Sequence, residues 1–232
     1  MKKIITIVLL AMLPGVEIIF AQTPIISSGA EFNSFMKSDL SYLEEQEARY
    51  AKFEGSPYLD EEFKHGGLVY KNKLFTNLLL RYNYYEGYFE IKTGDEVKFY
   101  DPRYTAVDTV WLESNKYIYI EHKDGKSIRR NYMKLLHDGP AKALTFKEII
   151  MLDPEPASGY KAARPARFDP RPEVTYIQFG DAPAVEFKNK RSIGEVFPTH
   201  VKEIEKHAKS ENLKFRDASD LVELVRYYNT LD

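Results

Sequence analysis

The chain has 232 residues with 33 Lys and Arg against 35 Asp and Glu, no cysteine, and 17 tyrosines. The near-neutral charge offers no general attraction for a polyanion, so nucleic-acid binding is disfavoured. Without cysteine the chain forms no disulfide bonds, and it has neither a thiol nucleophile nor a cysteine ligand for zinc.

The first 21 residues have the pattern of a secretory signal peptide. Met1-Lys2-Lys3 gives a positive start, an apolar run spans residues 4–13, and a small residue, Ala21, stands at the expected cleavage site. A retained membrane anchor is the weaker alternative, because a span needs about 20 apolar residues and Pro14 and Glu17 interrupt this run. We therefore expect a periplasmic or outer-membrane-associated protein with no transmembrane span in the mature chain.

Residues 22–54 are predicted to form an N-terminal arm. Apolar residues such as Phe32 and Tyr50 alternate irregularly with an acidic cluster at residues 44–47. The spacing fits an imperfect amphipathic helix or a loosely docked arm. A turn signal at Gly55-Ser56-Pro57 ends this segment.

Residues 55–188 are predicted to form an antiparallel β domain. Around Arg81, apolar and polar residues alternate with the period of a strand, and the apolar face switches beside Gly87, which indicates a bulge or tight turn. Further alternating segments follow at short spacing, separated by turn signals such as Asp124-Gly125 and Asp138-Gly139. The pattern predicts a meander of about eight to ten strands that curls into a half-barrel or highly twisted sheet. The later strands are expected at residues 97–99, 107–111, 117–121, 127–137, 142–152, 174–179 and 184–188.

A proline-rich basic segment interrupts the strands at residues 153–172. Five prolines alternate with one lysine and three arginines, and no periodicity is evident. Long loops inside a compact domain are functional or poorly ordered. Two interpretations stay open, a clamp that holds an anionic group with arginine and a solvated, mobile excursion.

The hydrophobic period becomes helical in residues 189–232. A capping-box pattern begins at Ser192, and Thr199 and Asp217 are candidate caps of two further helices. The apolar stripes of these helices need cover, so we expect them to pack on the sheet. The predicted fold is mainly β in an α+β arrangement, an antiparallel twisted sheet or half-barrel with two or three C-terminal helices packed on it.

Three short motifs carry a resemblance to known sequences. They are Gly55-Ser-Pro-Tyr-Leu59, Arg81-Tyr-Asn83 and, near the end of the helical tail, Tyr227-Tyr-Asn229. Together they resemble a group of uncharacterised exported proteins of Bacteroidetes over about residues 55–231. The resemblance implies an envelope location and a sheet with a helical tail, and it implies no activity.

Searches for catalytic and metal-binding patterns give little. His200, Glu203 and His207 lie on one face of the expected second helix, but no HExxH motif is present, and a solvated helix face explains all three. Nucleophile-elbow and phosphate-loop patterns are missing from the sequence. We therefore assign no catalytic residue, no metal ligand and no cofactor, and the binding residues stay unknown.

Two groups of residues keep a binding or catalytic alternative open. Asp60-Glu61-Glu62 beside aromatic residues resembles a two-carboxylate sugar site, although a charged sheet edge that discourages aggregation is the favoured interpretation. The rings at Tyr82, Tyr84, Tyr85, Tyr88 and Phe89 fit a half-buried sheet surface, and a concave aromatic platform for sugars or peptides is the alternative. Arg81 and Asn83 are expected to satisfy polar partners within the sheet.

Three functions follow from these patterns. The favoured one is a non-enzymatic envelope protein that acts as an interaction or structural module for an envelope or outer-membrane protein, which predicts an exposed apolar patch. The second is a binding module for a sugar, peptide or small apolar ligand, which predicts a deep cavity lined by tyrosine. The third is a two-carboxylate hydrolase, which predicts an acid with a raised pKa beside a second acid.

Overall fold

The computed structural model describes residues 50–104, 107 and 109–231, together with residues 25–26, 32 and 41–42. The expected signal peptide, residues 1–21, and most of the expected N-terminal arm, residues 22–54, lie outside the described residues. In the described part of that arm, a short strand stands at residues 41–42, where the helix was one alternative. No helix in the described chain is long and apolar enough to cross a membrane.

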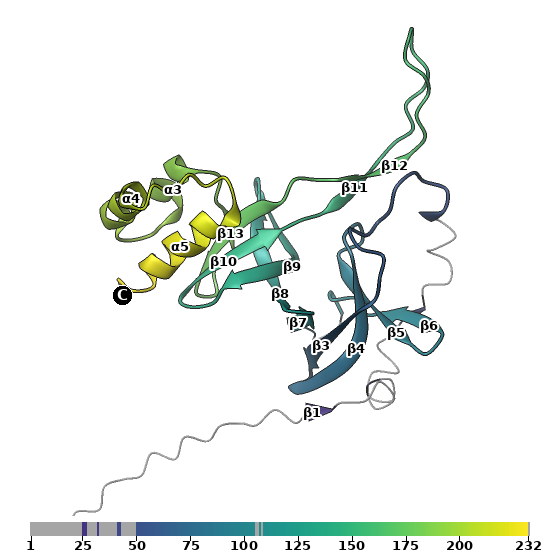
Figure 1. Ribbon diagram of the computed structural model, residues 1–232, viewed down its shortest axis with the longest axis horizontal. Coiled ribbons are helices and arrows are strands. Elements are labelled where there is room, and N and C mark those ends of the chain that lie inside the picture. The colour runs from purple at the N-terminus through teal and green to yellow at the C-terminus, as the bar shows by residue number, and fades with distance from the viewer. Residues whose placement is uncertain are drawn as a thin grey trace, which may run out of the picture.

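The strands form one large, open sheet with antiparallel pairing along its whole order (Figure 1). The order is β14-β13-β10-β9-β8-β7-β3-β4-β5-β6-β2, and β1 adds to β4 in parallel, giving twelve strands. The bounds are β1 Ile25–Ile26, β2 Ser41–Tyr42, β3 Lys64–Tyr70, β4 Lys73–Asn83, β5 Tyr88–Thr93, β6 Glu96–Phe99, β7 Thr109–Leu112, β8 Asn115–Asp124, β9 Ser127–His137, β10 Ala141–Phe146, β13 Val174–Phe179 and β14 Val185–Glu186. The mainly antiparallel β fold expected from the alternation is confirmed.

Tight turns join most neighbouring strands. Lys71 and Asn72 both have positive φ, 48° and 61°, which suits the two-residue turn between β3 and β4. Gly94 and Gly125 adopt the same left-handed region, with φ of 64° and 58°, where the sequence predicted hairpins. The switch of apolar face beside Gly87 is a turn between β4 and β5, because β4 ends at Asn83 and β5 begins at Tyr88.

One predicted strand is wrong. Residues 142–152 do not form a single element, since β10 ends at Phe146 and a new strand, β11, spans Ile149–Leu152. β11 leaves the large sheet and pairs instead with β12, Arg167–Pro170, in a second, two-stranded sheet. The chain changes sheets at Lys147-Glu148, where the alternation gave no signal.

Aromatic rings fill the core between the curled strands. Tyr82 lies 4.6 Å from Phe89 and 5.8 Å from Tyr117, and Tyr132 lies 5.1 Å from Phe89, measured between ring centroids. The Tyr132 hydroxyl donates to the carbonyl of Val107 at 2.6 Å, so its polar end is satisfied inside the core. Rings packed in this way contribute about 0.5–1.5 kcal/mol per pair beyond their buried area.

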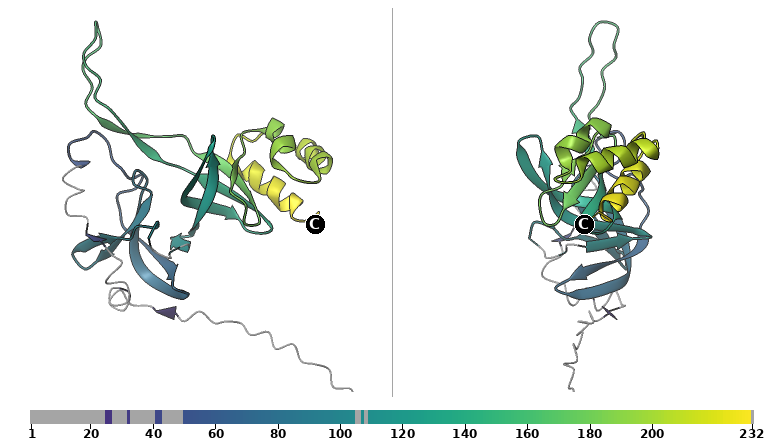
Figure 2. Two further views of the ribbon diagram at one scale, coloured as in Figure 1. Left: turned by 180° about the vertical axis from the view of Figure 1, so that it is seen from behind. Right: turned by 90° about the vertical axis from the view of Figure 1, so that its left-hand side faces the viewer.

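The helical tail covers one face of the sheet at β10 and β13. A short 3₁₀ helix, Lys190–Ser192, leads into α3 Ile193–Val196, α4 Val201–Ser210 and α5 Ala218–Tyr228. Their apolar faces pack on strand residues in a cluster that includes Ala143, Ile177, Ile204, Leu224 and Val225. Figures 1 and 2 show α5 lying along the sheet, with α3 and α4 outside it. The expected packing of the tail on the sheet is confirmed.

Two of the three predicted helix caps differ from expectation. Asp217 caps α5 as predicted, accepting a hydrogen bond from the Ser219 backbone amide. Helix α4 begins after His200 instead of Thr199, and the Thr199 hydroxyl bonds to the Tyr228 hydroxyl at 3.0 Å. Ser192 precedes α3 without a side-chain capping bond, since its side chain is buried.

A side-chain clasp joins the end of the tail to the sheet. The Asn229 amide accepts from the Ala141 backbone amide at 2.8 Å and donates to the Ala141 carbonyl at 2.9 Å. Asn229 therefore bonds to the backbone of β10 as a neighbouring strand would. A methyl group on Gly139 would come within 2.6 Å of the Asn229 side-chain nitrogen, so this turn needs glycine.

The buried phenols give the protein a predictable response to alkali. Burial raises the pKa of Tyr82 and Tyr100 above 10, and burial raises the pKa of Tyr176 to about 12. Above about pH 10 the unfolded chain loses phenolic protons that the folded chain keeps, so the free energy of unfolding falls by about 1.4 kcal/mol per pH unit for each such tyrosine. Below that pH this contribution is fully present.

We expect urea unfolding to show a constant contribution from tyrosine up to about pH 10 and a steep loss of stability above it. Ultraviolet titration of the folded protein should show Tyr82 and Tyr100 keeping their phenolic protons above pH 10. A single ionisation midpoint near pH 10 for all tyrosines, with the protein still folded, would contradict this assignment.

Candidate functional site

A projecting two-stranded arm is the most distinctive part of the surface (Figures 1 and 2). It is built by β11 and β12 and continues beyond them, because Glu155 pairs with Arg164 and Ser158 pairs with Lys161 in the same register. Gly159, with φ of 58°, forms the two-residue turn at the tip together with Tyr160. Residues 149–170 therefore make one β-ribbon, which we call the arm.

The arm corrects the prediction for residues 153–172. The sequence predicted an irregular loop, and the structure has a paired hairpin in which the Glu155 and Arg164 backbones exchange two hydrogen bonds of 2.9 Å. The ribbon was not recognised from the sequence, because prolines are atypical of strands. They nevertheless leave these backbone pairs intact. The signal for the turn was the Gly159-Tyr160 pair, which lies at the centre of residues 149–170.

Aromatic packing fixes the base of the arm. Phe168 of β12 is buried against Tyr50, Phe53 and Tyr85, with ring centroids 5.6, 5.7 and 5.2 Å away. Ile149 of β11 is buried in the same cluster. The base is therefore a small core of its own beneath the ribbon.

Backbone hydrogen bonds attach this base to the segment that precedes the sheet. Glu54 donates to the Ala166 carbonyl at 3.0 Å and accepts from the Phe168 amide at 2.9 Å. The Ile149 amide donates to the Tyr84 carbonyl at 3.1 Å. Gly55 follows with φ of 81°, and a methyl group there would press within 3.4 Å of the Phe168 carbonyl. Glycine thus allows the chain to turn away directly beneath the arm.

A buried ion pair lies next to this base, at the end of β4 and β5. Glu90 is fully buried, and its Oε2 accepts from the Arg81 guanidinium at 2.6 and 2.9 Å. Its Oε1 accepts from the Tyr58 hydroxyl at 2.7 Å and from the Asn83 amide at 3.1 Å. The guanidinium lies over the rings of Tyr58 and Phe63, 3.8 and 4.5 Å from their centroids. Every side of the buried charge is therefore satisfied.

Asn83 links the ion pair to the base of the arm. Its amide donates to the Tyr50 hydroxyl at 3.3 Å, and that hydroxyl donates to Glu86 at 3.0 Å. Its Oδ1 accepts from the backbone amides of Tyr85 and Glu86, which form the turn after β4. The raised pKa of Tyr50, caused chiefly by burial, keeps this hydroxyl a donor at neutral pH. As predicted, Arg81 and Asn83 serve partners within the protein.

Two of the three motifs quoted above meet at this place. Tyr58 of the first motif and Arg81 and Asn83 of the second surround Glu90, and Gly55 contacts the base of the arm. No sequence pattern connects these motifs with residues 153–172. The connection comes from three-dimensional packing, in which Phe168 packs against both Tyr50 and Tyr85.

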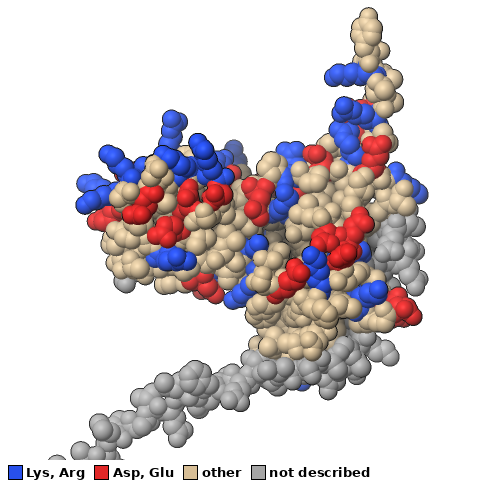
Figure 3. All heavy atoms as spheres, viewed as in Figure 1, with Lys and Arg blue, Asp and Glu red and all other residues tan. Residues whose placement is uncertain are grey.

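The outer arm has an exposed surface with equal numbers of acidic and basic side chains. Residues 153–165 are all exposed, and the tip residue Tyr160 has its whole side chain in solvent. Nearer the base, Arg167 pairs with Glu155 at 3.2 Å, while Lys161 and Arg164 have no ion-pair partner among the described residues. Figure 3 shows the ribbon standing clear of the body with basic side chains along it. Three exposed prolines, Pro154, Pro156 and Pro165, lie along its two strands.

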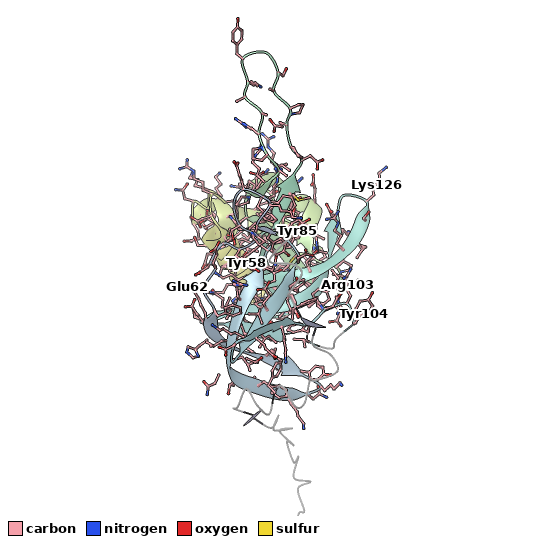
Figure 4. The ribbon with its side chains drawn as sticks, turned by 90° about the vertical axis from the view of Figure 1, so that its right-hand side faces the viewer. Tyr58, Glu62, Tyr85, Arg103, Tyr104 and Lys126 are labelled. Carbon is pink, nitrogen blue, oxygen red and sulfur yellow. The ribbon has the colours of Figure 1, made fainter. Side chains whose placement is uncertain are left out.

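The remaining candidate residues are the histidines of the tail and the acidic cluster at residues 60–62. His200 stands at the start of α4, and the His207 ring stacks on Tyr227 at 3.8 Å, near Glu223. No cluster in the described part of the chain has the geometry to hold a metal ion. Asp60 pairs with Lys64, and Glu62 projects from the molecule in Figure 4. Residues 60–62 form no strand and precede β3, an inner strand, so the interpretation as a charged sheet edge is wrong.

In the described part of the chain, the carboxyl groups whose pKa values are shifted all have lowered values, the opposite of what a general acid needs. A hydrogen bond from Lys64 lowers the pKa of Asp60, a bond from Arg103 lowers that of Asp101, and a bond from Ser219 lowers that of Asp217. A general acid needs a raised value at neutral pH.

Three cavities open on the described surface. One of about 460 Å³ lies between β13 and the start of α5, and one of about 370 Å³ lies between the β5–β6 and β8–β9 hairpins. The third, of about 100 Å³, is lined by Tyr82, Tyr84, Tyr117 and Tyr132. The tyrosine-lined cavity is thus much smaller than the range of about 300–1,000 Å³ typical of small-molecule sites. Large apolar side chains that are exposed stand singly, as Leu59, Ile128 and Met151 do.

No family model, curated protein or solved structure matches this chain in the three comparisons.

The buried ion pair can be tested by truncation. We expect Glu90→Ala to lower the free energy of unfolding by about 3–5 kcal/mol, because it leaves the Arg81 charge buried without its partner. Denaturant unfolding measures this change. The control Glu62→Ala removes an exposed carboxylate and should change stability by no more than about 0.5 kcal/mol. Equal effects of the two substitutions would contradict the assignment.

Proposed function

We propose that the protein is an exported, non-enzymatic interaction module of the cell envelope and that the arm is its contact element. The observation that carries this proposal is the arm itself, in which residues 153–165 form a paired ribbon whose whole surface is exposed. The amino-terminal sequence supports export, and the resemblance to exported Bacteroidetes proteins supports an envelope location.

The stability of two-stranded ribbons supports a contact role. An isolated hairpin in water is marginally stable at best and needs a third layer or a partner to hold it. Here the base of the arm is held by Phe168 and its aromatic neighbours, while the outer part has no packing of its own. A partner surface would supply that packing, and the exposed ring of Tyr160 is suited to enter a pocket on it.

The position of the buried network supports the same role. The bonds among Glu90, Arg81 and Asn83 fix this end of β4 and β5. Tyr50 bonds to Asn83 through its hydroxyl and packs on Phe168 through its ring, which joins the network to the base of the arm. A binding element on a rigid base loses less conformational freedom on association than a free loop does. The costly buried charge thus serves to set the direction of the arm.

Site-specific cross-linking tests the proposal. A photoreactive residue at position 160, in the protein expressed in its native envelope, should give a discrete adduct that identifies the partner. The same residue at position 128 is the matched control, because Ile128 is also exposed and lies on the separate β8–β9 hairpin. Absence of an adduct at 160, or equal adducts at 160 and 128, would contradict the role of the arm.

Shortening the arm completes the test. Replacing residues 154–165 with a two-residue Asn-Gly turn should leave the free energy of unfolding within about 1 kcal/mol of the original, because the removed residues are exposed. The partner that the cross-link identifies should no longer co-purify. A variant that unfolds instead would show that the arm serves the fold.

A second candidate function, sugar binding, is favoured by the 370 Å³ cavity. Its lining combines aromatic rings, Tyr88 and Tyr119, with the donors and acceptors of Arg103, Arg130 and Asn131. The Asn131 Oδ1 already bonds to His122 at 2.9 Å, so its amide nitrogen faces Gly87 and the cavity. Figure 4 shows Arg103 beside Tyr104 on this side of the molecule. Aromatic faces with paired donors and acceptors suit a polyhydroxyl ligand.

Neutral monosaccharides at millimolar concentration test this second function. Saturation-transfer NMR should detect glucose, galactose or N-acetylglucosamine bound to the original protein. We expect Asn131→Ala to weaken the signal by loss of one donor to the ligand, while Asn115→Ala, at the far end of β8, should leave it unchanged. No transfer to any of these sugars would remove sugar binding as the second candidate.

A further inference from the structure

We propose that the partner of the arm is a second copy of this chain, whose 460 Å³ cavity receives the tip residue Tyr160. This inference rests on the proposed function of the arm and adds the identity of its receptor. It joins the fully exposed ring of Tyr160 to the cavity of about 460 Å³ between β13 and the start of α5.

The cavity has an aromatic floor. Phe187 is buried, Phe215 lies 5.1 Å from it between ring centroids, and Leu221 of α5 closes the bottom. The two phenylalanine rings are inclined by 62°, an edge-on arrangement that a third ring can extend. A phenol is suited to such a floor because its ring is apolar and its hydroxyl can stay at the polar rim.

Charge at the rim complements the residue that follows the tip. Glu173 is exposed at the mouth of the cavity and has no ion-pair partner among the described residues, and Lys161 is likewise unpaired next to Tyr160. The Asp217 carboxylate and the Arg216 guanidinium both line the cavity and offset each other, so Glu173 leaves the rim with a net negative charge. Lys188 bonds to Glu186, so that pair is nearly neutral.

The outer arm as a whole is neutral, and so is the receptor tail, because residues 189–232 carry eight Lys and Arg against eight Asp and Glu. Asp153 and Glu155 balance Lys161 and Arg164 between residues 153 and 165. Figure 3 shows blue and red side chains intermixed over the helical tail. A neutral ribbon with one cation next to its tip can therefore approach Glu173 at the rim without general repulsion.

The geometry excludes docking of the arm onto its own chain. The ribbon runs about 30 Å from its base to its tip, at about 3.3 Å per residue. In both figures that show its direction, it points away from β13 and α5, which line the cavity (Figures 1 and 2). Two copies related by a twofold axis can each supply an arm and a cavity, which closes the assembly as a dimer.

Disulfide trapping tests this contact directly, because the chain has no cysteine of its own. Tyr160→Cys on one copy and Ala218→Cys, at the cavity, on a second copy of different tag size should form a mixed disulfide under mild oxidation. The matched control replaces Tyr160→Cys with Ile128→Cys on the β8–β9 hairpin, which should give no more mixed product than random collision does. Equal yields in the two mixtures would overturn the proposal.

Sedimentation of the chain from Gln22 onward provides the second test. The original protein should associate with rising concentration, and Tyr160→Ala should weaken that association at least about tenfold, as loss of an aromatic anchor does. Glu173→Lys should weaken it as well, and Lys161→Glu combined with Glu173→Lys should restore part of the loss. All three substitutions change exposed side chains, so the variants should unfold at the same denaturant concentration as the original.

The outcomes separate this inference from the proposed function. A protein that stays monomeric up to about 100 μM, with no specific disulfide, overturns self-association. The function proposed for the arm then stands or falls with the cross-link at position 160, which would identify a different protein. An adduct at position 160 with twice the mass of the chain supports both.

Discussion

The buried contact between Arg81 and Glu90 is the constraint on which the structure depends. A carboxylate taken fully out of water is costly unless its oxygens are bonded, and four donors from three side chains satisfy this one. Those donors come from the segment before the sheet and from β4, so the ion pair fixes two parts of the chain at once. The aromatic base of the arm is built against the same place.

The pattern of burial explains why the protein can carry a projecting element without disulfide bonds. The sheet is lined with tyrosine and phenylalanine, whose rings give large buried areas and whose hydroxyls find partners such as the Val107 carbonyl. The tail covers the sheet at β10 and β13, and Asn229 bonds to the backbone of β10 as a neighbouring strand would. Because this burial stabilises the body of the protein, the ribbon can remain exposed.

Sequence patterns predicted the parts of the structure that follow local rules. The strand at Ser127–His137 and the cap at Asp217 were found because alternation and capping act over a few residues. The division of residues 142–152 between two sheets was missed, because both pieces alternate alike and only distant pairing separates them. The arm was missed for a related reason, since its pairing is regular while its proline content is typical of a loop. The Glu90 network could not be predicted, because Tyr58 and Glu90 are 32 residues apart in the chain.

The prolines of the ribbon have a consequence for how the protein behaves at high concentration. Unpaired edges of two-stranded ribbons invite further strands to add, and repeated addition leads to fibrils. Pro154, Pro156 and Pro165 lack the amide hydrogen that such growth requires, and they interrupt the outward-facing donors on both edges. The arm can therefore contact a neighbour through its side chains, while its prolines keep its backbone from pairing with the added strands of an aggregate.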